Sequence, residues 1–263
     1  MLILSLILNF YIFLLGLVIG SFLNCVIYRL EKEQSFLKGR SYCPHCKHNL
    51  IWLDLIPVFS FLFLKGKCRY CGKKISIQYT IVEIITGLIF LFIYNEIINL
   101  PQLTISNFIS FCFLFIVSSF LIIIFVYDLK HYMILDKVLF PAIAISLLYR
   151  LFIIFSIWNY LFAALIASGF FLFIFLISKG KWMGFGDVKL AILLGLLLGF
   201  PNILVGLFLA FFFGAIIGLA LIFLNKKGLK SEIPFAPFLI IGTFIAMFFG
   251  SQIIQWYLNF FKP

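Results

Sequence analysis

The chain has 263 residues, of which 65% are hydrophobic and only 11% are charged. This composition lies far outside the range of soluble globular domains and indicates a protein whose solvent is mainly the lipid bilayer. A net charge of +11 could suit a nucleic-acid partner, but in a membrane protein Lys and Arg report topology first, so no nucleic-acid partner is expected.

About eight apolar stretches are separated by short polar breaks. A spanning helix needs about 20 mostly apolar residues. The expected spans are 2–27, 80–98, 106–127, 138–155, 157–177, 188–200, 203–224 and 234–257. The stretch 188–200 is short and ends at Pro201, so seven spans are an alternative. The sequence predicts an all-α polytopic membrane protein of about eight transmembrane helices.

Lys and Arg gather in alternate loops. If the N-terminus lies outside, the cytoplasmic loops are 28–79, 128–137, 178–189 and 225–233. These loops hold eighteen of the twenty Lys and Arg residues, with Arg150 and Lys262 elsewhere, which fits the positive-inside rule. We therefore expect a first transmembrane helix over 1–27, a cytoplasmic loop over 28–79, and a membrane region of about seven helices over 80–263.

The cytoplasmic loop after the first span carries two C-x-x-C pairs. Cys43 and Cys46 are followed, 21 residues later, by Cys68 and Cys71. This spacing is that of a zinc ribbon, in which four thiolates complete a tetrahedral site and fold a loop that has no core. Two disulfides are the alternative, but cytoplasmic thiols are normally reduced. The sequence predicts a structural zinc site of four cysteines; His45 and His48 could replace a ligand but are more simply ordinary loop histidines.

Only nine acidic residues are available for any carboxylate chemistry. Asp128 ends the third span and Asp187 opens the sixth, so both lie at the same predicted membrane boundary. Asp187 could be an ordinary helix cap, whereas the helix dipole disfavours an anion in the last turn that Asp128 occupies. Asp136 is most simply a cap, and Glu83 could pair with a basic loop residue.

Two carboxyl groups that converge in a partly dry site would share a proton, because two close negative charges are costly. One Asp would then draw a proton from water while the other donates to the leaving amine, which is aspartic peptidase chemistry. Gly184 and Gly186 would let a substrate backbone approach Asp187 closely.

Four segments together resemble the type IV prepilin peptidase family, in the GxGD group of membrane aspartic proteases. They are GLVIGSFLNCVIYRL at 16–30, the cysteine loop continuing through KGKCRYCGKKISIQYTIVE at 65–83, DLKHYMILD at 128–136 and GFGDVKL at 184–190. Each motif is short, but their order and sidedness are specific. The match covers most of the chain.

The resemblance implies Asp128 and Asp187 as the catalytic pair, with Gly184 and Gly186 shaping the second segment. It implies prepilin or pseudopilin substrates, whose leader is removed at the cytoplasmic edge of a hydrophobic helix. It also implies a multi-pass protein of the bacterial inner membrane, in contact with the lipid bilayer.

The resemblance further implies a methyltransferase. Family members with the cysteine loop methylate the new N-terminal residue using S-adenosylmethionine, and Gly66 and Glu83 match positions that the family associates with methylation. The residues themselves show no glycine fingerprint for a nucleotide cofactor. Methyl transfer therefore rests on the resemblance alone.

One departure concerns the segment before Asp136. The family usually has Leu-Pro-Asp there, whereas this chain has Leu135 in place of the proline and Leu139 where Thr is common. Loss of the fixed proline φ puts the backbone shape before the fourth helix in doubt, but not the Asp128 and Asp187 pair.

Three other functions fit parts of the sequence. An intramembrane GxGD protease could act on another substrate, because the chemistry alone does not select prepilins. An ion-coupled or proton-coupled transporter would place acidic groups near mid-span in broken helices. A non-catalytic zinc-ribbon assembly subunit would tolerate replacement of both Asp residues by Asn.

Overall fold

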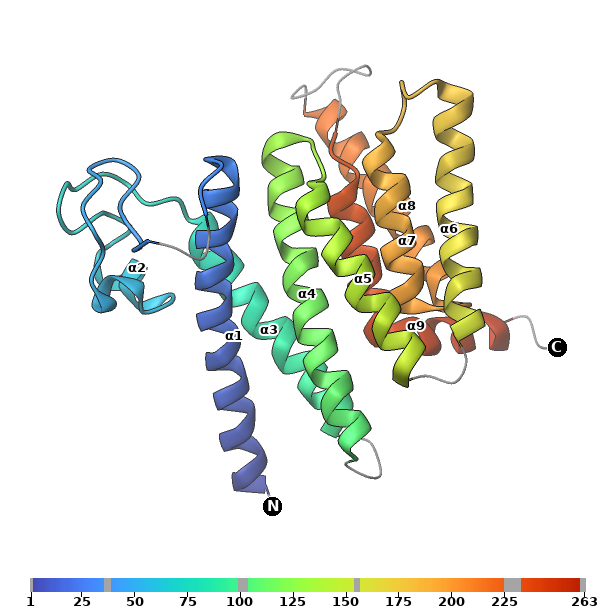
Figure 1. The fold of residues 1–263 in the computed structure, drawn as a ribbon, viewed down its shortest axis with the longest axis horizontal. Coiled ribbons are helices and arrows are strands. Elements are labelled where there is room, and N and C mark those ends of the chain that lie inside the picture. Colours follow the sequence, from blue (N-terminus) through green and yellow to red (C-terminus); the bar gives the residue numbers. More distant parts are fainter. Residues whose placement is uncertain (1, 36–38, 99–103, 154–156, 225–232, 261–263) are drawn as a thin grey trace. The chain divides into compact units, whose positions relative to one another are not determined.

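The computed structural model describes residues 2–35, 39–98, 104–153, 157–224 and 233–260 (Figure 1). Within these ranges the regular elements are helices, and no strand occurs. They are α1 (Leu2–Glu31), the 3-10 helix η1 (Trp52–Leu55), α2 (Phe59–Phe63), α3 (Gln78–Ile98), α4 (Ile105–His131), α5 (Asp136–Ile153), α6 (Ile157–Ser178), α7 (Phe185–Leu198), α8 (Asn202–Phe223) and α9 (Ala236–Phe260).

A helix occupies each of the eight expected spans, which confirms the all-α polytopic prediction. Among the described residues, six helices are long and apolar enough to cross a membrane, namely α1, α3, α4, α6, α8 and α9. The two others are α5, which carries three charged residues, and α7. The 14 residues of α7 rise about 21 Å, less than the roughly 30 Å of a bilayer core.

Contacts divide the chain into two compact units, residues 1–123 and 124–263, with the division inside α4. The cysteine loop belongs to the first unit, and Asp128 and Asp187 both belong to the second. The predicted division at residues 27 and 79 follows motifs rather than compactness, and it stays a prediction.

In the first unit α1 and α3 cross at a point where glycines remove the side chains. A Cβ atom on Gly16 would lie 2.6 Å from the Cα of Gly87, and one on Gly20 would lie 2.7 Å from the Cα of Glu83. These distances are too short for any side chain. The crossing therefore brings α1 against the part of α3 that carries Glu83.

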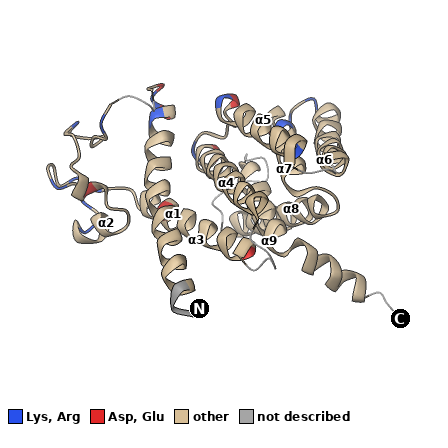
Figure 2. Ribbon diagram, turned by 60° about the horizontal axis from the view of Figure 1, so that its bottom comes forward, with Lys and Arg blue, Asp and Glu red and all other residues tan. Residues whose placement is uncertain are grey.

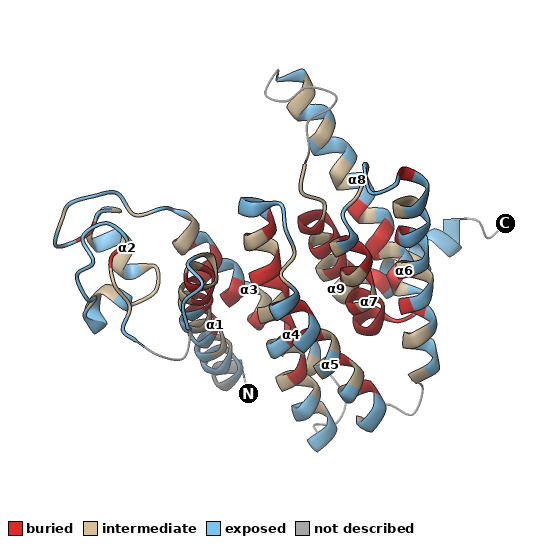
Figure 3. Cartoon of the chain, turned by 45° about the horizontal axis from the view of Figure 1, so that its top comes forward, coloured by how far each residue is buried: buried red, intermediate tan, exposed pale blue. Residues whose placement is uncertain are grey.

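In the second unit α7 is the central helix. Ten of its 14 residues are buried, whereas α6 and α8 expose large apolar side chains on their outer faces, including Phe173, Leu176, Phe208 and Phe223 (Figure 3). Gly195 allows α7 to approach α6 closely, since a Cβ atom there would lie 2.3 Å from the Cα of Ala164. A buried helix inside an apolar outer surface is the arrangement that a bilayer requires.

The buried end of α7 is capped by a cation from another helix. The Arg150 guanidinium of α5 donates from Nε to the Leu196 carbonyl at 2.9 Å and from Nη2 to the Leu197 carbonyl at 2.8 Å. It also lies over the Tyr160 ring, 3.7 Å from the centroid. The last carbonyls of a helix have no partners within it, so Arg150 satisfies two groups that lipid could not.

The helix that begins at Asp136 forms without the family's proline. The Leu135 carbonyl accepts hydrogen bonds from the N–H groups of Val138 and Leu139, each at 3.0 Å. These bonds start α5 at Asp136. The leucine at position 135 therefore does not prevent a regular start of this helix.

Candidate functional site

Asp128 and Asp187 are both buried in the second unit, with exposed fractions of 5% and 9%. Asp128 lies in the last turn of α4 and Asp187 in the first turn of α7. They are close enough for the Asp128 charge to act on Asp187. The structure thus brings together the two carboxylates that the sequence singled out, in an interior where unpaired charges are costly.

Asp187 is not the N-cap of α7. The N-cap residue is Gly184, and the helix begins at Phe185, three residues before the predicted start at 188. Asp187 is therefore the third residue of the helix. Its carboxylate interacts with the backbone N–H of Gly184. The interpretation of Asp187 as the N-cap is therefore wrong; its carboxylate lies inside the first turn and reaches back to the N–H of the N-cap residue.

Asp128 is stabilised by a helix that sequence reasoning did not connect with it. Its carboxylate interacts with the backbone N–H of Ala236, the first residue of α9. The first N–H groups of a helix lack partners within it and form the positive end of its dipole. The dipole of α4 therefore disfavours the Asp128 charge, whereas the N-terminus of α9 stabilises it. Pro237, early in α9, was the available signal for that helix start.

The two glycines of the second segment have different surroundings. A Cβ atom on Gly184 would have only Asp187 Oδ2 and the Gly186 nitrogen nearby, each at 3.9 Å. A Cβ atom on Gly186 would lie 3.2 Å from the Cβ of Ile134. Gly184 therefore leaves open space beside Asp187, whereas Gly186 permits close packing against the segment between α4 and α5.

Asp136 does not join the buried pair. Its carboxylate forms an ion pair with Lys189, and its side chain is 53% exposed. It lies at the start of α5, as a residue that begins a helix would. This accounts for Asp136 without a catalytic role.

The four cysteines of the loop form one cluster. The sulfur atoms of Cys43, Cys46, Cys68 and Cys71 all lie within 4.8 Å of one another and could hold a metal ion. The Cys43 and Cys71 sulfur atoms are 4.0 Å apart, about twice the roughly 2.05 Å of a disulfide, and the cysteines are free. The spacing argument for a four-sulfur metal site is therefore supported by the geometry.

The two cysteine pairs sit on equivalent turns. The Cys43 N–H donates to the His48 carbonyl, and the Cys68 N–H donates to the Lys73 carbonyl, at 3.0 and 2.8 Å. Burial raises the pKa of the Cys43 thiol, but the backbone N–H groups of Cys46 and His45 outweigh it and lower the pKa to about 7. A thiolate is the form that binds metal.

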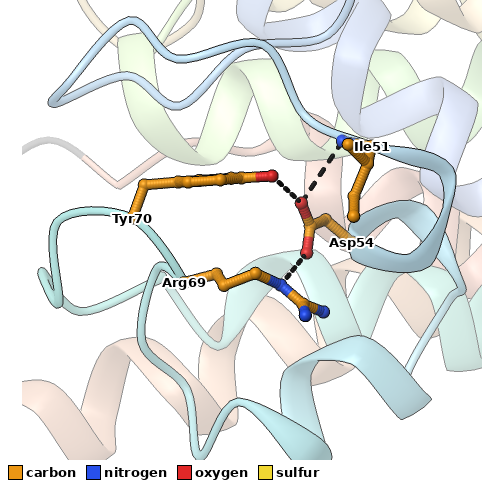
Figure 4. A network of polar contacts seen from close by, with 4 residues as sticks. All are labelled: Ile51, Asp54, Arg69 and Tyr70. Carbon is orange, nitrogen blue, oxygen red and sulfur yellow. Dashed lines mark hydrogen bonds and ion pairs between the residues drawn. The ribbon is translucent and has the colours of Figure 1, made fainter.

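An ion-pair network holds the segment between the cysteine pairs in place (Figure 4). The Asp54 carboxylate accepts from Arg69 Nε at 2.8 Å, from the Tyr70 hydroxyl at 3.2 Å and from the Ile51 N–H at 3.3 Å. The Tyr70 ring also packs at a tilt against the His48 ring, with 3.7 Å between the ring centroids. Asp54 therefore fixes η1 to the second cysteine pair, a role that the sequence did not indicate.

A cavity of about 340 Å³ lies in the first unit, among α1, the start of α3 and the cysteine loop. Its lining includes Asn24, Arg29, Arg40, Thr80 and Glu83. Within the described part of the chain, Asn24 Oδ1 and Thr80 Oγ1 are buried and have no hydrogen-bond partner. Unpaired buried acceptors and donors are costly, so these two atoms point to a polar ligand.

The two predicted methylation residues differ in their relation to this cavity. Glu83 lines it, and its carboxylate accepts the Val58 N–H at 2.8 Å. Gly66 has a left-handed φ of +67°, and a Cβ atom there would lie 3.1 Å from Phe61, whose ring lines the cavity. Gly66 therefore shapes the cavity wall through Phe61.

Comparison with known proteins gives one consistent result. Residues 14–97 match the Bacterial Peptidase A24 N-terminal domain, and residues 115–219 match the Type IV leader peptidase family. Proteins named prepilin leader peptidase/N-methyltransferase are similar over almost the whole chain.

The one from Aeromonas hydrophila is 30% identical over 95% of this chain and 93% of its own length. The one from Bacillus subtilis (strain 168) is 30% identical over 94% and 97%, and the one from Dichelobacter nodosus is 31% identical over 94% and 93%. No solved structure matches. These matches cover both units and both site segments, so the chain belongs to the type IV leader peptidase family, as the motifs predicted.

Proposed function

We propose that this protein is a membrane aspartic endopeptidase that removes the leader peptide of type IV prepilins or pseudopilins. The observation that carries the proposal is the burial of Asp128 and Asp187 together, each beside the N-terminus of a helix. The relatives named as prepilin leader peptidases support the choice of substrate.

The chemistry follows from two carboxyl groups in one dry site. One proton is shared, because two close negative charges cannot both be stabilised cheaply. The ionised carboxylate accepts a proton from water as that water attacks the scissile carbonyl, and the protonated carboxyl donates to the departing amine. Gly184, which has open space beside Asp187, allows the peptide backbone to come close.

The site would lie at the cytoplasmic face of the bacterial inner membrane. The six candidate spans among the described residues support a multi-pass protein, and the bias of Lys and Arg supports an N-terminus outside. Figure 2 shows Lys and Arg gathered on the loop that carries α2 and at helix ends. A prepilin would enter with its apolar helix in the bilayer and its basic leader in the cytoplasm.

We further propose that the cysteine cluster binds zinc and that the cavity beside it binds S-adenosylmethionine. Four sulfurs in one cluster suit a tetrahedral structural zinc site. When bound, S-adenosylmethionine supplies an electrophilic methyl group. Arg40 would bind its carboxylate, and Asn24 Oδ1 and Thr80 Oγ1 would gain the partners they lack. Glu83 would take the proton that the new N-terminal amine loses.

The test separates the two reactions in lipid vesicles. Cleavage is measured on a prepilin, and methylation on a pilin that already lacks its leader. Asp128→Asn and Asp187→Asn should each lower cleavage by at least about 10²-fold, the usual contribution of acid–base catalysis, and leave methylation unchanged. Asp136→Asn is the matched control, because Asp136 is exposed and paired with Lys189. Near wild-type cleavage by either buried-Asp variant would refute the catalytic pair.

The alternatives make different demands on the same assay. A GxGD protease for another substrate would cleave neither prepilin nor pseudopilin while its Asp residues remained essential for some other peptide. A transporter would need acidic groups along a path through the bilayer, whereas Asp128 and Asp187 lie at helix ends. The full-length similarity to prepilin leader peptidases favours the main proposal over both.

A further inference from the structure

The cysteine loop exposes a group of large apolar side chains that the peptidase and the methyltransferase do not use. We call Trp52, Phe59, Leu62 and Phe63 the outer patch; their exposed fractions are 73%, 51%, 62% and 82%. Single exposed apolar residues are common on proteins. Four large ones within twelve consecutive positions indicate contact with something apolar.

Three residues of the outer patch, Phe59, Leu62 and Phe63, lie on one face of α2, and the fourth, Trp52, begins η1. The other face of α2 lines the cavity. Ser60, Phe61 and Leu64 are lining residues, whereas Phe59, Leu62 and Phe63 are not. The helix α2 thus separates the cavity from the surroundings of the outer patch.

A hydrogen bond to a spanning helix fixes the position of α2 along the membrane normal. The N–H of Val58, which precedes α2, donates to Glu83 Oε2 at 2.8 Å. Glu83 is the sixth residue of α3, about 7.5 Å along the helix from its start. In Figure 1, α2 accordingly lies beside α1, away from the end of α1 at Glu31. The patch therefore lies at the level of the first turns of a membrane-spanning helix.

The charges around the patch suit a bilayer surface. Lys65 and Lys67 follow α2 directly, and the loop 28–79 carries ten Lys and Arg residues against three acidic ones. Basic residues beside apolar and aromatic side chains are the composition of segments that lie in the interface of a bilayer with anionic lipids. A tryptophan such as Trp52 prefers the same interface.

We propose that the outer patch inserts into the headgroup and acyl boundary of the bilayer, so that α2 is a membrane-embedded wall of the cavity. The loop is then anchored to the membrane at a third point, in addition to α1 and α3. The cavity opens next to the membrane surface, where an amine freed at the edge of an apolar helix would emerge. The lipid contact itself does not depend on the peptidase or methyltransferase assignment.

The test places a photoactivatable phenylalanine analogue at single positions of the full-length protein in vesicles of phosphatidylethanolamine and phosphatidylglycerol. Positions 59 and 63 probe the patch. Phe173, 64% exposed on α6, is the lipid-facing reference, and Asn49, exposed near the first cysteine pair, is the aqueous reference. After illumination, lipid adducts are counted by mass spectrometry.

The patch positions should give adducts at a level comparable with position 173, and at least about ten-fold more than position 49 (about 1.4 kcal/mol). Adduct levels at 59 and 63 no higher than at 49 would overturn the proposal. So would crosslinks from these positions to a second copy of the chain, or to an added prepilin in place of lipid. Cleavage and methylation measured on the same samples keep these outcomes separate from any failure of the proposed function.

Discussion

Replacement of Arg150 by Met should loosen the second unit at the end of α7 opposite Asp187. Arg150 is 6% exposed and makes two bonds to the carbonyls of Leu196 and Leu197. Bonds from a charged donor contribute about 1.5–3 kcal/mol each, so roughly 3–6 kcal/mol of interaction is lost. An uncharged side chain recovers part of this because a buried cation is itself costly, which leaves a net destabilisation of about 2–4 kcal/mol.

The assay is unfolding in mixed micelles by increasing amounts of a denaturing detergent, combined with prepilin cleavage. Arg150→Lys should recover only part of the stability, because an ammonium group lacks the planar fork that reaches two carbonyls. Leu151→Met is the matched control, since Leu151 is 54% exposed on the same helix. We expect cleavage to fall with stability, and methylation to be retained. An Arg150→Met variant as stable as the Leu151→Met control would refute the capping argument.

Three other changes follow from the contacts. Cys68→Ser should remove the bound metal and destabilise the loop, as metal analysis of the purified protein would show; full metal retention would exclude a four-sulfur site. Gly195→Ala should lower the free energy of unfolding by about 1–3 kcal/mol, because the added Cβ would lie 2.3 Å from a backbone atom. Gly169→Ala, where nothing lies within 4 Å of the added Cβ, should not destabilise the protein. Equal unfolding midpoints for the two variants would contradict the close contact between α6 and α7. Glu83→Gln should abolish methylation and spare cleavage, while Gln at the exposed Glu96 changes neither; unimpaired methylation by Glu83→Gln would remove Glu83 from that reaction.

The helices and the cysteine cluster were predictable because the responsible signals are local. An apolar stretch must be helical in a bilayer, since every backbone group needs an internal partner there. Two C-x-x-C pairs carry their own turn geometry, and the cluster of Cys43, Cys46, Cys68 and Cys71 follows from it. The pairing of Asp128 with Asp187 also came from local facts, namely that both stand at ends of spans on the same predicted side.

The partners of these residues were not predictable, because they are backbone groups of helices distant in the sequence. Nothing around Asp128 indicates that the N–H of Ala236 lies beside it. In the sequence Arg150 is only an exception to the charge pattern, whereas in the structure its guanidinium binds the last carbonyls of α7. The sequence around Asp54 likewise does not indicate that Arg69 and Tyr70 donate to its carboxylate. Because nearly every residue has a backbone carbonyl and a backbone N–H, a side chain whose partner is one of these groups is not matched by any particular residue type in the sequence.

The shortness of α7 has a consequence for the cell that contains this protein. A hydrolase in a membrane must admit water to its carboxylates without letting protons cross the bilayer. Asp187 stands at one end of α7, whose following turns carry the buried side chains of Leu190, Leu193 and Leu194, and Arg150 binds the last carbonyls at the other end. Beyond Asp187, about 15 Å of buried apolar helix therefore separates the site from the other end of α7 and offers water no polar path. The enzyme can consume water at one face and still preserve the electrochemical gradient on which the membrane depends.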